Sequence, residues 1–231
     1  MLSSLLMDVF VVPVGPERYE LYCETSTESE AEPEPLPDGV LGKLRYRFAA
    51  MLKAAEEHQH NHAEPAQSWF GRLQERTLAW VAERIAEQRL LWNLRKQTTA
   101  VAAHPQDMTF EQVMTLIRRM LQHDYQRHRR WLVVDTLLLI GSGVFMLVPG
   151  PNLLAYYFAF RVVGHYLSMR GAEQGLHHVT WSGRACPPLS ELRDVSTLEP
   201  TMREARIHDV ASRLRLQHLS AFFERVAVRH A

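Results

Sequence analysis

Residues 131–169 decide the expected fold class; they read WLVVDTLLLIGSGVFMLVPGPNLLAYYFAFRVVGHYLSM. Residues 136–160 of this stretch carry no charged side chain. An apolar run of that length is typical of a membrane helix, because the core helices of soluble proteins rarely avoid charge for so long. Proline disfavours helix at the residue before it, so the run should form a hairpin with arms over residues 131–148 and 153–169. The predicted turn residues are Pro149, Gly150, Pro151 and Asn152.

The flanks of this hairpin predict how it would sit in a membrane. Each arm would reach about 25 Å at ~1.5 Å per residue, slightly less than the roughly 30 Å hydrocarbon core. The hairpin could therefore span with local thinning or re-enter without crossing. Arg127, Arg129 and Arg130 precede the first arm and Arg170 follows the second, whereas the turn is uncharged. The positive-inside bias then predicts both termini on the cytoplasmic side, or on the matrix side in an organelle.

Three ionisable side chains interrupt the arms. If the turn lies near residue 150, Asp135 and His165 fall at the same depth and Arg161 lies about one turn deeper. An ionisable residue in lipid is costly and usually faces a partner or a water path. We therefore predict that Asp135, Arg161 and His165 form an intramembrane polar cluster. It could be a proton or cation relay, because a carboxylate beside a histidine can exchange protons near neutral pH. It could also be an ion pair that only satisfies its own charges.

Two short segments precede the predicted helices. Residues 1–23 contain a β-branched run, a Gly-Pro turn and then alternating apolar residues, a pattern that predicts a short β-hairpin. Pro13 restricts its strand to a sheet edge or places it at a strand end. Residues 24–39 are acidic and proline-rich and contain no basic side chain. Such a segment cannot bury apolar surface, so we predict a disordered linker.

The rest of the chain is expected to be helical. Residues 40–130 show helical apolar spacing and are predicted to form helices on the cytoplasmic side. Thr109 and Gln112 form a capping box at the start of the last of these helices, which should continue into the hairpin. Residues 170–231 predict a loop and an amphipathic helix. The expected fold class is therefore a mainly α membrane protein with one two-helix apolar hairpin.

The composition excludes several functions. The 26 basic and 26 acidic side chains give a formal net charge of zero, which argues against nucleic-acid binding. Cys23 and Cys186 are far apart and fit no disulfide framework or metal-ligand spacing. His58, His60 and His62 lie close together, but with no second ligand set we expect a solvated tract and no metal site. No catalytic or cofactor-binding motif is present, so an enzyme is the weakest class and no cofactor is expected.

The hairpin and its flanks carry motifs that point to a known family. They are His128-Arg129-Arg130-Trp131, Val148-Pro149-Gly150-Pro151-Asn152, Tyr156-Tyr157, Arg161, His165-Tyr166 and Arg170-Gly171-Ala172. The opening residues 9–15 with Tyr22-Cys23 accompany these motifs. Together they resemble the mitochondrial potassium–proton exchange-related family over about half of the chain. The resemblance implies involvement in exchanging potassium for protons across a coupling membrane. Because the chain starts without an Arg-rich presequence, we expect a bacterial relative.

One hairpin cannot enclose a transport path alone, since secondary transporters hold their substrate between repeats of several helices. We therefore predict a membrane protein that assists potassium–proton exchange as a homo-oligomer or as an accessory subunit of a larger membrane complex. It would contact lipid in a bacterial inner membrane, or in a mitochondrial inner membrane. The alternative is a membrane-anchored scaffold whose helices, at residues 41–96 and 201–227, bind a partner protein.

Overall fold

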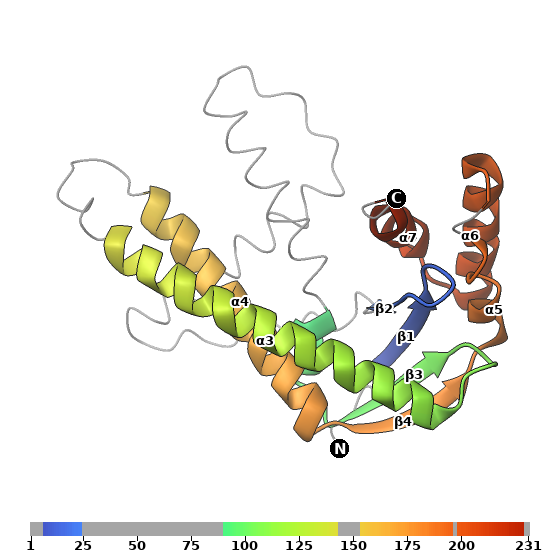
Figure 1. Cartoon of the computed structure of the whole chain (residues 1–231), viewed down its shortest axis with the longest axis horizontal. Helices are drawn as coiled ribbons and strands as arrows, with labels where there is room; N and C mark the ends of the chain where they lie inside the picture. Colours follow the sequence, from blue (N-terminus) through green and yellow to red (C-terminus); the bar gives the residue numbers. More distant parts are fainter. Residues whose placement is uncertain (1–6, 25–89, 143–152, 196–197, 229–231) are drawn as a thin grey trace. The chain divides into compact units, whose positions relative to one another are not determined.

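The computed structural model describes residues 7–24, 90–142, 153–195 and 198–228 (Figure 1). The chain divides into two compact units. The first comprises residues 1–26, 90–130 and 167–231, and it holds all four described strands. The second comprises residues 27–89 and 131–166; its described part is formed by segments of two long helices, α3 (Phe110–Ser142) and α4 (Leu153–His177).

The first unit is built on a four-stranded mixed sheet with the order β2-β1-β3-β4. Strands β1 (Met7–Pro13) and β2 (Tyr19–Tyr22) form the predicted N-terminal hairpin, and Pro13 ends its strand. Strand β3 (Thr99–His104) pairs in parallel with β1, and β4 (Thr180–Ala185) pairs in parallel with β3.

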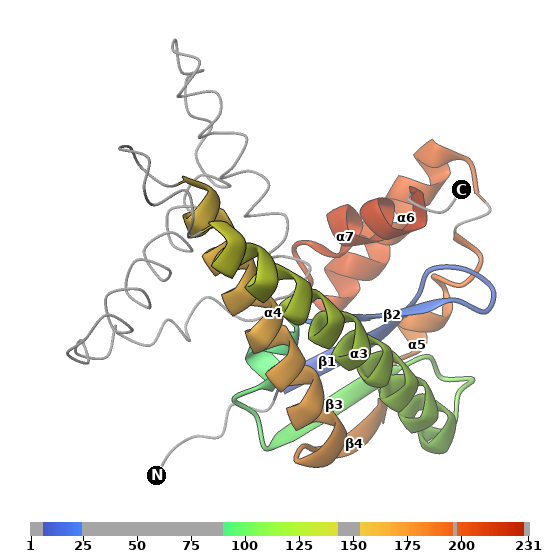
Figure 2. The same cartoon turned by 60° about the vertical axis from the view of Figure 1, so that its left-hand side comes forward.

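Helices cover both faces of this sheet (Figures 1 and 2). Val9 and Val11 of β1 pack in a cluster with α3 and α4. Phe10 and Val12 pack in the opposite cluster, with α5 (Pro187–Ser190), α6 (Pro200–Leu214) and α7 (Leu219–Val228). A strand buried on both faces is apolar throughout, and this burial explains the continuous β-branched run at the start of the chain.

Glycines bring α4 close to its neighbours in the first unit. A Cβ on Gly171 would lie 1.8 Å from the carbonyl oxygen of Leu91. A Cβ on Gly175 would lie 2.4 Å from the Leu94 side chain and 2.9 Å from that of Leu121. The small residues of the Arg170-Gly171-Ala172 motif therefore allow a close helix approach to residues 90–94.

Helix α3 begins at the predicted capping box. The Thr109 amide donates to Gln112 Oε1 at 2.9 Å, and the Gln112 amide donates to Thr109 Oγ1 at 3.3 Å. From there α3 continues without a break to Ser142, as the sequence predicted.

The expected fold class, a mainly α membrane protein with one apolar hairpin, is wrong. The chain forms a mixed sheet with helices on both faces, and two of the strands, β3 and β4, lie in segments predicted as helix and loop. In the part of the chain that the structure describes, none of the helices combines the length and apolarity that a membrane crossing needs.

Several sequence predictions fall outside the described residues. They are the turn residues Pro149, Gly150, Pro151 and Asn152, residues 25–39 of the linker predicted over 24–39, residues 40–89 of the helices predicted over 40–130, and the tract of His58, His60 and His62.

Candidate functional site

The described part of the second unit brings Asp135, Arg161 and His165 together. Arg161 Nε donates to Asp135 Oδ2 at 3.0 Å, and His165 Nε2 lies 3.2 Å from the same oxygen. Asp135 comes from α3, whereas Arg161 and His165 come from α4. Residues four apart lie on one face of a helix, so Arg161 and His165 point to the same carboxylate.

The three side chains differ in their access to solvent. The Asp135 side chain is fully buried, while Arg161 is 24% and His165 15% exposed. Asp135 Oδ1 is also buried, and no described residue donates a hydrogen bond to it. Most buried polar atoms in folded proteins have a partner, so an orphaned carboxylate oxygen calls for an explanation. Asp135 therefore retains acceptor capacity that the described residues do not use.

Two aromatic rings complete the cluster. Arg161 Nη1 donates to Tyr157 Oη at 3.2 Å. The Arg161 guanidinium carbon lies 5.4 Å from the centre of the Trp131 ring, within cation–π range. The Trp131 ring also stacks on His165, with ring centres 6.5 Å apart and an interplanar angle of 17°. We call Trp131, Asp135, Tyr157, Arg161 and His165 the polar cluster.

Sequence reasoning did not assign Trp131 and Tyr157 to this site. A spacing signal was nevertheless present, because Trp131 lies four residues before Asp135 and Tyr157 lies four before Arg161. Side chains at this spacing share a helix face.

The charges of the polar cluster allow one proton to enter and leave. With neutral His165, the opposite charges of Asp135 and Arg161 cancel. With protonated His165, the cluster carries one net positive charge, and Nε2 of this histidine lies 3.2 Å from the Asp135 carboxylate. Histidine is the side chain whose ordinary pKa lies closest to physiological pH. The arrangement can therefore hold and return a proton without leaving a buried charge unpaired.

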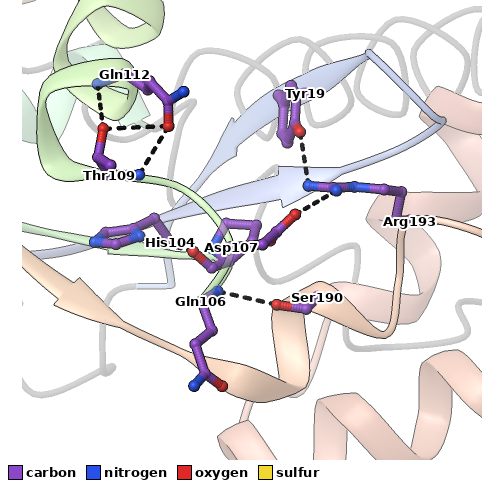
Figure 3. A network of polar contacts seen from close by, with 9 residues as sticks. Tyr19, His104, Gln106, Asp107, Thr109, Gln112, Ser190 and Arg193 are labelled. Atoms are coloured by element: carbon purple, nitrogen blue, oxygen red, sulfur yellow. Dashed lines mark hydrogen bonds and ion pairs between the residues drawn. The ribbon is translucent and has the colours of Figure 1, made fainter.

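A second polar network lies in the first unit, beyond the carboxyl ends of the parallel strands (Figure 3). Arg193 donates to Tyr19 Oη at 2.9 Å and forms an ion pair with Asp107. The Gln106 amide donates to Ser190 Oγ at 2.9 Å. Ligands of open α/β sheets often bind at this edge, but here the polar groups bond to one another. We interpret the network as a structural link that holds β2 to the segments after β3 and α5.

Comparison with known proteins agrees with the resemblance seen in the sequence. The model of a family described as mitochondrial K⁺–H⁺ exchange-related matches residues 8–179, from β1 to the residue before β4. The match covers most of the chain and includes the whole polar cluster, and the chain belongs to this family. Its role is therefore related to mitochondrial potassium–proton exchange, and the family description associates it with mitochondria. No curated protein and no solved structure shows significant similarity to the chain.

Proposed function

We propose that the protein assists potassium–proton exchange by accepting and returning a proton at Asp135 and His165, in a non-enzymatic role. The observation that carries this proposal is the buried Asp135 carboxylate, which contacts both Arg161 and His165 while its Oδ1 atom has no described hydrogen-bond partner. Arg161 forms an ion pair with the carboxylate, and the remaining partner, His165, is a residue type that can change its charge near neutral pH.

We further propose that the protein acts as an oligomer or as an accessory subunit of a larger membrane complex. Its described helices contribute one polar cluster with a single acidic residue, whereas transporters enclose their sites between repeats of several helices. The route for potassium would then lie in the assembled complex, and this chain would supply a proton-accepting group.

Exposed apolar side chains beside the polar cluster support contact with lipid or with an apolar carrier surface. Leu137 and Ile140 are 64% and 69% exposed, and Val133 is exposed as well. Clustered exposed apolar residues usually mark an interaction surface. We propose that this face of α3 lies in the membrane interface, where apolar side chains enter the boundary between headgroups and acyl chains.

The scaffold alternative receives less support. Of the two helical segments proposed to bind a partner, residues 41–89 lie outside the described residues. The other segment forms α6 and α7, whose apolar residues Ile207, Val210 and Phe223 are buried against the sheet. That face is therefore occupied within the chain itself.

Potassium-driven proton flux tests the proposed function. Membrane vesicles from cells that produce wild-type or Asp135→Asn protein would be loaded with a pH-sensitive dye and given a potassium gradient. We expect Asp135→Asn to slow the potassium-dependent pH change by at least about tenfold, because the variant removes the charge that holds the protonated histidine. The matched control is Asp209→Asn, which removes an exposed carboxylate on α6. A folded Asp135→Asn variant with unchanged potassium-dependent proton flux would contradict the proposal.

A further inference from the structure

Strand β4 is an edge of the sheet with an accessible outer side. Among the described strands it pairs only with β3, and all of its residues except Trp181 are exposed. Both views place it outermost, beyond β3 (Figures 1 and 2).

The hydrogen bonds to β3 identify the backbone groups that face outward. The Thr180 amide donates to the Thr98 carbonyl at 2.8 Å, and the Cys186 amide donates to the His104 carbonyl at 2.7 Å. In a parallel ladder every second residue bonds to the same neighbour. The N–H and C=O groups of Trp181, Gly183 and Ala185 must therefore point away from β3. No described residue is hydrogen-bonded to these groups.

This edge lacks the usual protection against pairing. Natural proteins blunt free edges with proline, lysine, bulges or very short strands. The other edge strand, β2, has only four residues, whereas β4 has six and contains neither proline nor lysine. The charge of Arg184 is paired with Asp8 of the same sheet at 2.8 Å. The edge is thus open to another strand.

We propose that a second copy of the chain covers this edge by antiparallel pairing of the two β4 strands about a two-fold axis at Gly183. In this register Gly183 lies opposite Gly183 of the second copy, and Trp181 lies opposite Ala185. All three outward-facing residues of each strand are then paired, which forms about six backbone hydrogen bonds. Shifting the register by two residues would leave an outward-facing residue unpaired in each copy.

The sequence of β4 is complementary to itself in this register. The large Trp181 meets the small Ala185, and Arg184 meets Ser182, so that the two arginines do not face each other. Phe110 provides a further apolar contact: it lies against Gly183, where a Cβ would approach its ring to 2.5 Å, and it is still 40% exposed. The two-fold axis places the two Phe110 rings on the same face near the centre of the pairing. Because the formal net charge of the chain is zero, net electrostatic repulsion does not oppose the association of two copies.

This dimer rests on the proposed function in one respect, since it supplies an interface for the proposed oligomer. The two are tested separately, because dimerisation is measured without any ion flux. A dimer without transport activity would contradict only the proposed function, and transport by a monomer would contradict only the dimer.

Sedimentation of the full-length chain over a range of concentrations tests the interface. We expect wild-type protein to be dimeric and Ala185→Pro to be monomeric where the wild type is dimeric. The Ala185 amide faces outward, so that proline removes no bond to β3 but blocks the new ladder. The matched control Ala185→Ser keeps the amide and should stay dimeric. Wild-type protein that sediments as a monomer at every concentration would overturn the inference.

A cross-link tests the register independently of the proline variant. Opposite residues of a non-hydrogen-bonded antiparallel pair have Cα atoms about 4.5 Å apart, within the range of about 4.4–6.8 Å for disulfides. The Ser182→Cys/Arg184→Cys double variant should form a reducible dimer on mild oxidation. Ser182→Cys alone should not, and this single variant also controls for the native Cys23 and Cys186. A wild-type dimer that persists in Ala185→Pro and gives no cross-link in the double variant would refute the β4 interface.

Discussion

Replacing Arg161 with methionine should destabilise the protein more than neutralising Asp135. Arg161→Met keeps much of the aliphatic side chain but leaves a fully buried carboxylate with His165 as its only ionisable contact among the described residues. Removing one partner of a buried ion pair costs about 3–5 kcal/mol. Asp135→Asn leaves the positive charge on Arg161 instead, and that side chain is 24% exposed and can be hydrated. We therefore expect the asparagine variant to cost only about 1–2 kcal/mol, within the range for a lost charge-assisted hydrogen bond.

A double-mutant cycle measures the coupling between these residues. Urea unfolding followed by circular dichroism would give the free energy of unfolding for wild type, both single variants and Asp135→Asn/Arg161→Met. The double variant contains no buried unpaired charge, so its cost should fall below the sum of the single costs by about 1–3 kcal/mol. Additive costs, or a loss below about 1 kcal/mol for Arg161→Met, would refute the reasoning that Arg161 compensates a buried carboxylate.

Four further predictions follow from the geometry. Gly171→Ala should lower the free energy of unfolding, measured in a thermal melt, by about 1–3 kcal/mol or more, because its Cβ would overlap the Leu91 carbonyl oxygen. The control Gly141→Ala has open space at its Cβ and should be neutral or stabilising by up to about 1 kcal/mol. Thr109→Ala should cost about 1 kcal/mol in urea unfolding through loss of the α3 cap, and an unchanged midpoint would contradict that role. Burial raises the pKa of Asp124, so its ionisation on going to neutral pH destabilises the folded state. Asp124→Asn should therefore raise the free energy of unfolding at pH 7. This gain should disappear below about pH 4, where the Asp124 carboxyl is protonated in the unfolded state too. Leu137→Ser/Ile140→Ser should reduce co-flotation with anionic phospholipid vesicles several-fold, whereas Met202→Ser, which changes an exposed apolar residue on α6, should not.

Local sequence signals predicted those parts of the fold that depend on neighbouring residues. The N-terminal hairpin follows from a β-branched run and a Gly-Pro turn, and the start of α3 follows from Thr109 and Gln112. Helical spacing and the assumed turn placed Asp135 and His165 at the same depth, and the structure brings their side chains together. In each case the residues that form the sequence pattern are close together in the chain, or they lie on two helices joined by one short connection.

The parallel strands were missed because their pairing is not local. Strand β3 pairs with β1, yet these strands are separated by the whole segment from β2 to residue 98. Its sequence, Thr-Ala-Val-Ala-Ala-His, is rich in alanine, which is depleted in strands, and it shows no alternation because both faces are buried. Strand β4 contains Gly183 and is exposed, so its apolar signal is weak.

The membrane hairpin was predicted from an apolar run, and such a run does not by itself define what covers it. The first arm is the end of a helix whose earlier residues pack on the sheet: Val113, Ile117 and Leu121 of α3 are buried there. Trp131 was missed as a member of the polar cluster because its contact with Arg161 joins two helices. Tyr157 lies four residues before Arg161 on the same helix, so helical spacing was a signal that could have identified it.

The pH dependence of potassium-driven proton flux in a His165→Gln variant tests the central claim most directly. Glutamine can still donate a hydrogen bond to Asp135 but cannot carry a proton at neutral pH. In the vesicle assay we expect the wild-type rate to change with pH across the range in which histidine titrates, about pH 5.5–7.5. The His165→Gln variant should be at least about tenfold slower, with no pH dependence in that range. A folded His165→Gln variant with the wild-type rate and pH profile would contradict proton exchange at this cluster and would leave Asp135, Arg161 and His165 as a structural ion pair.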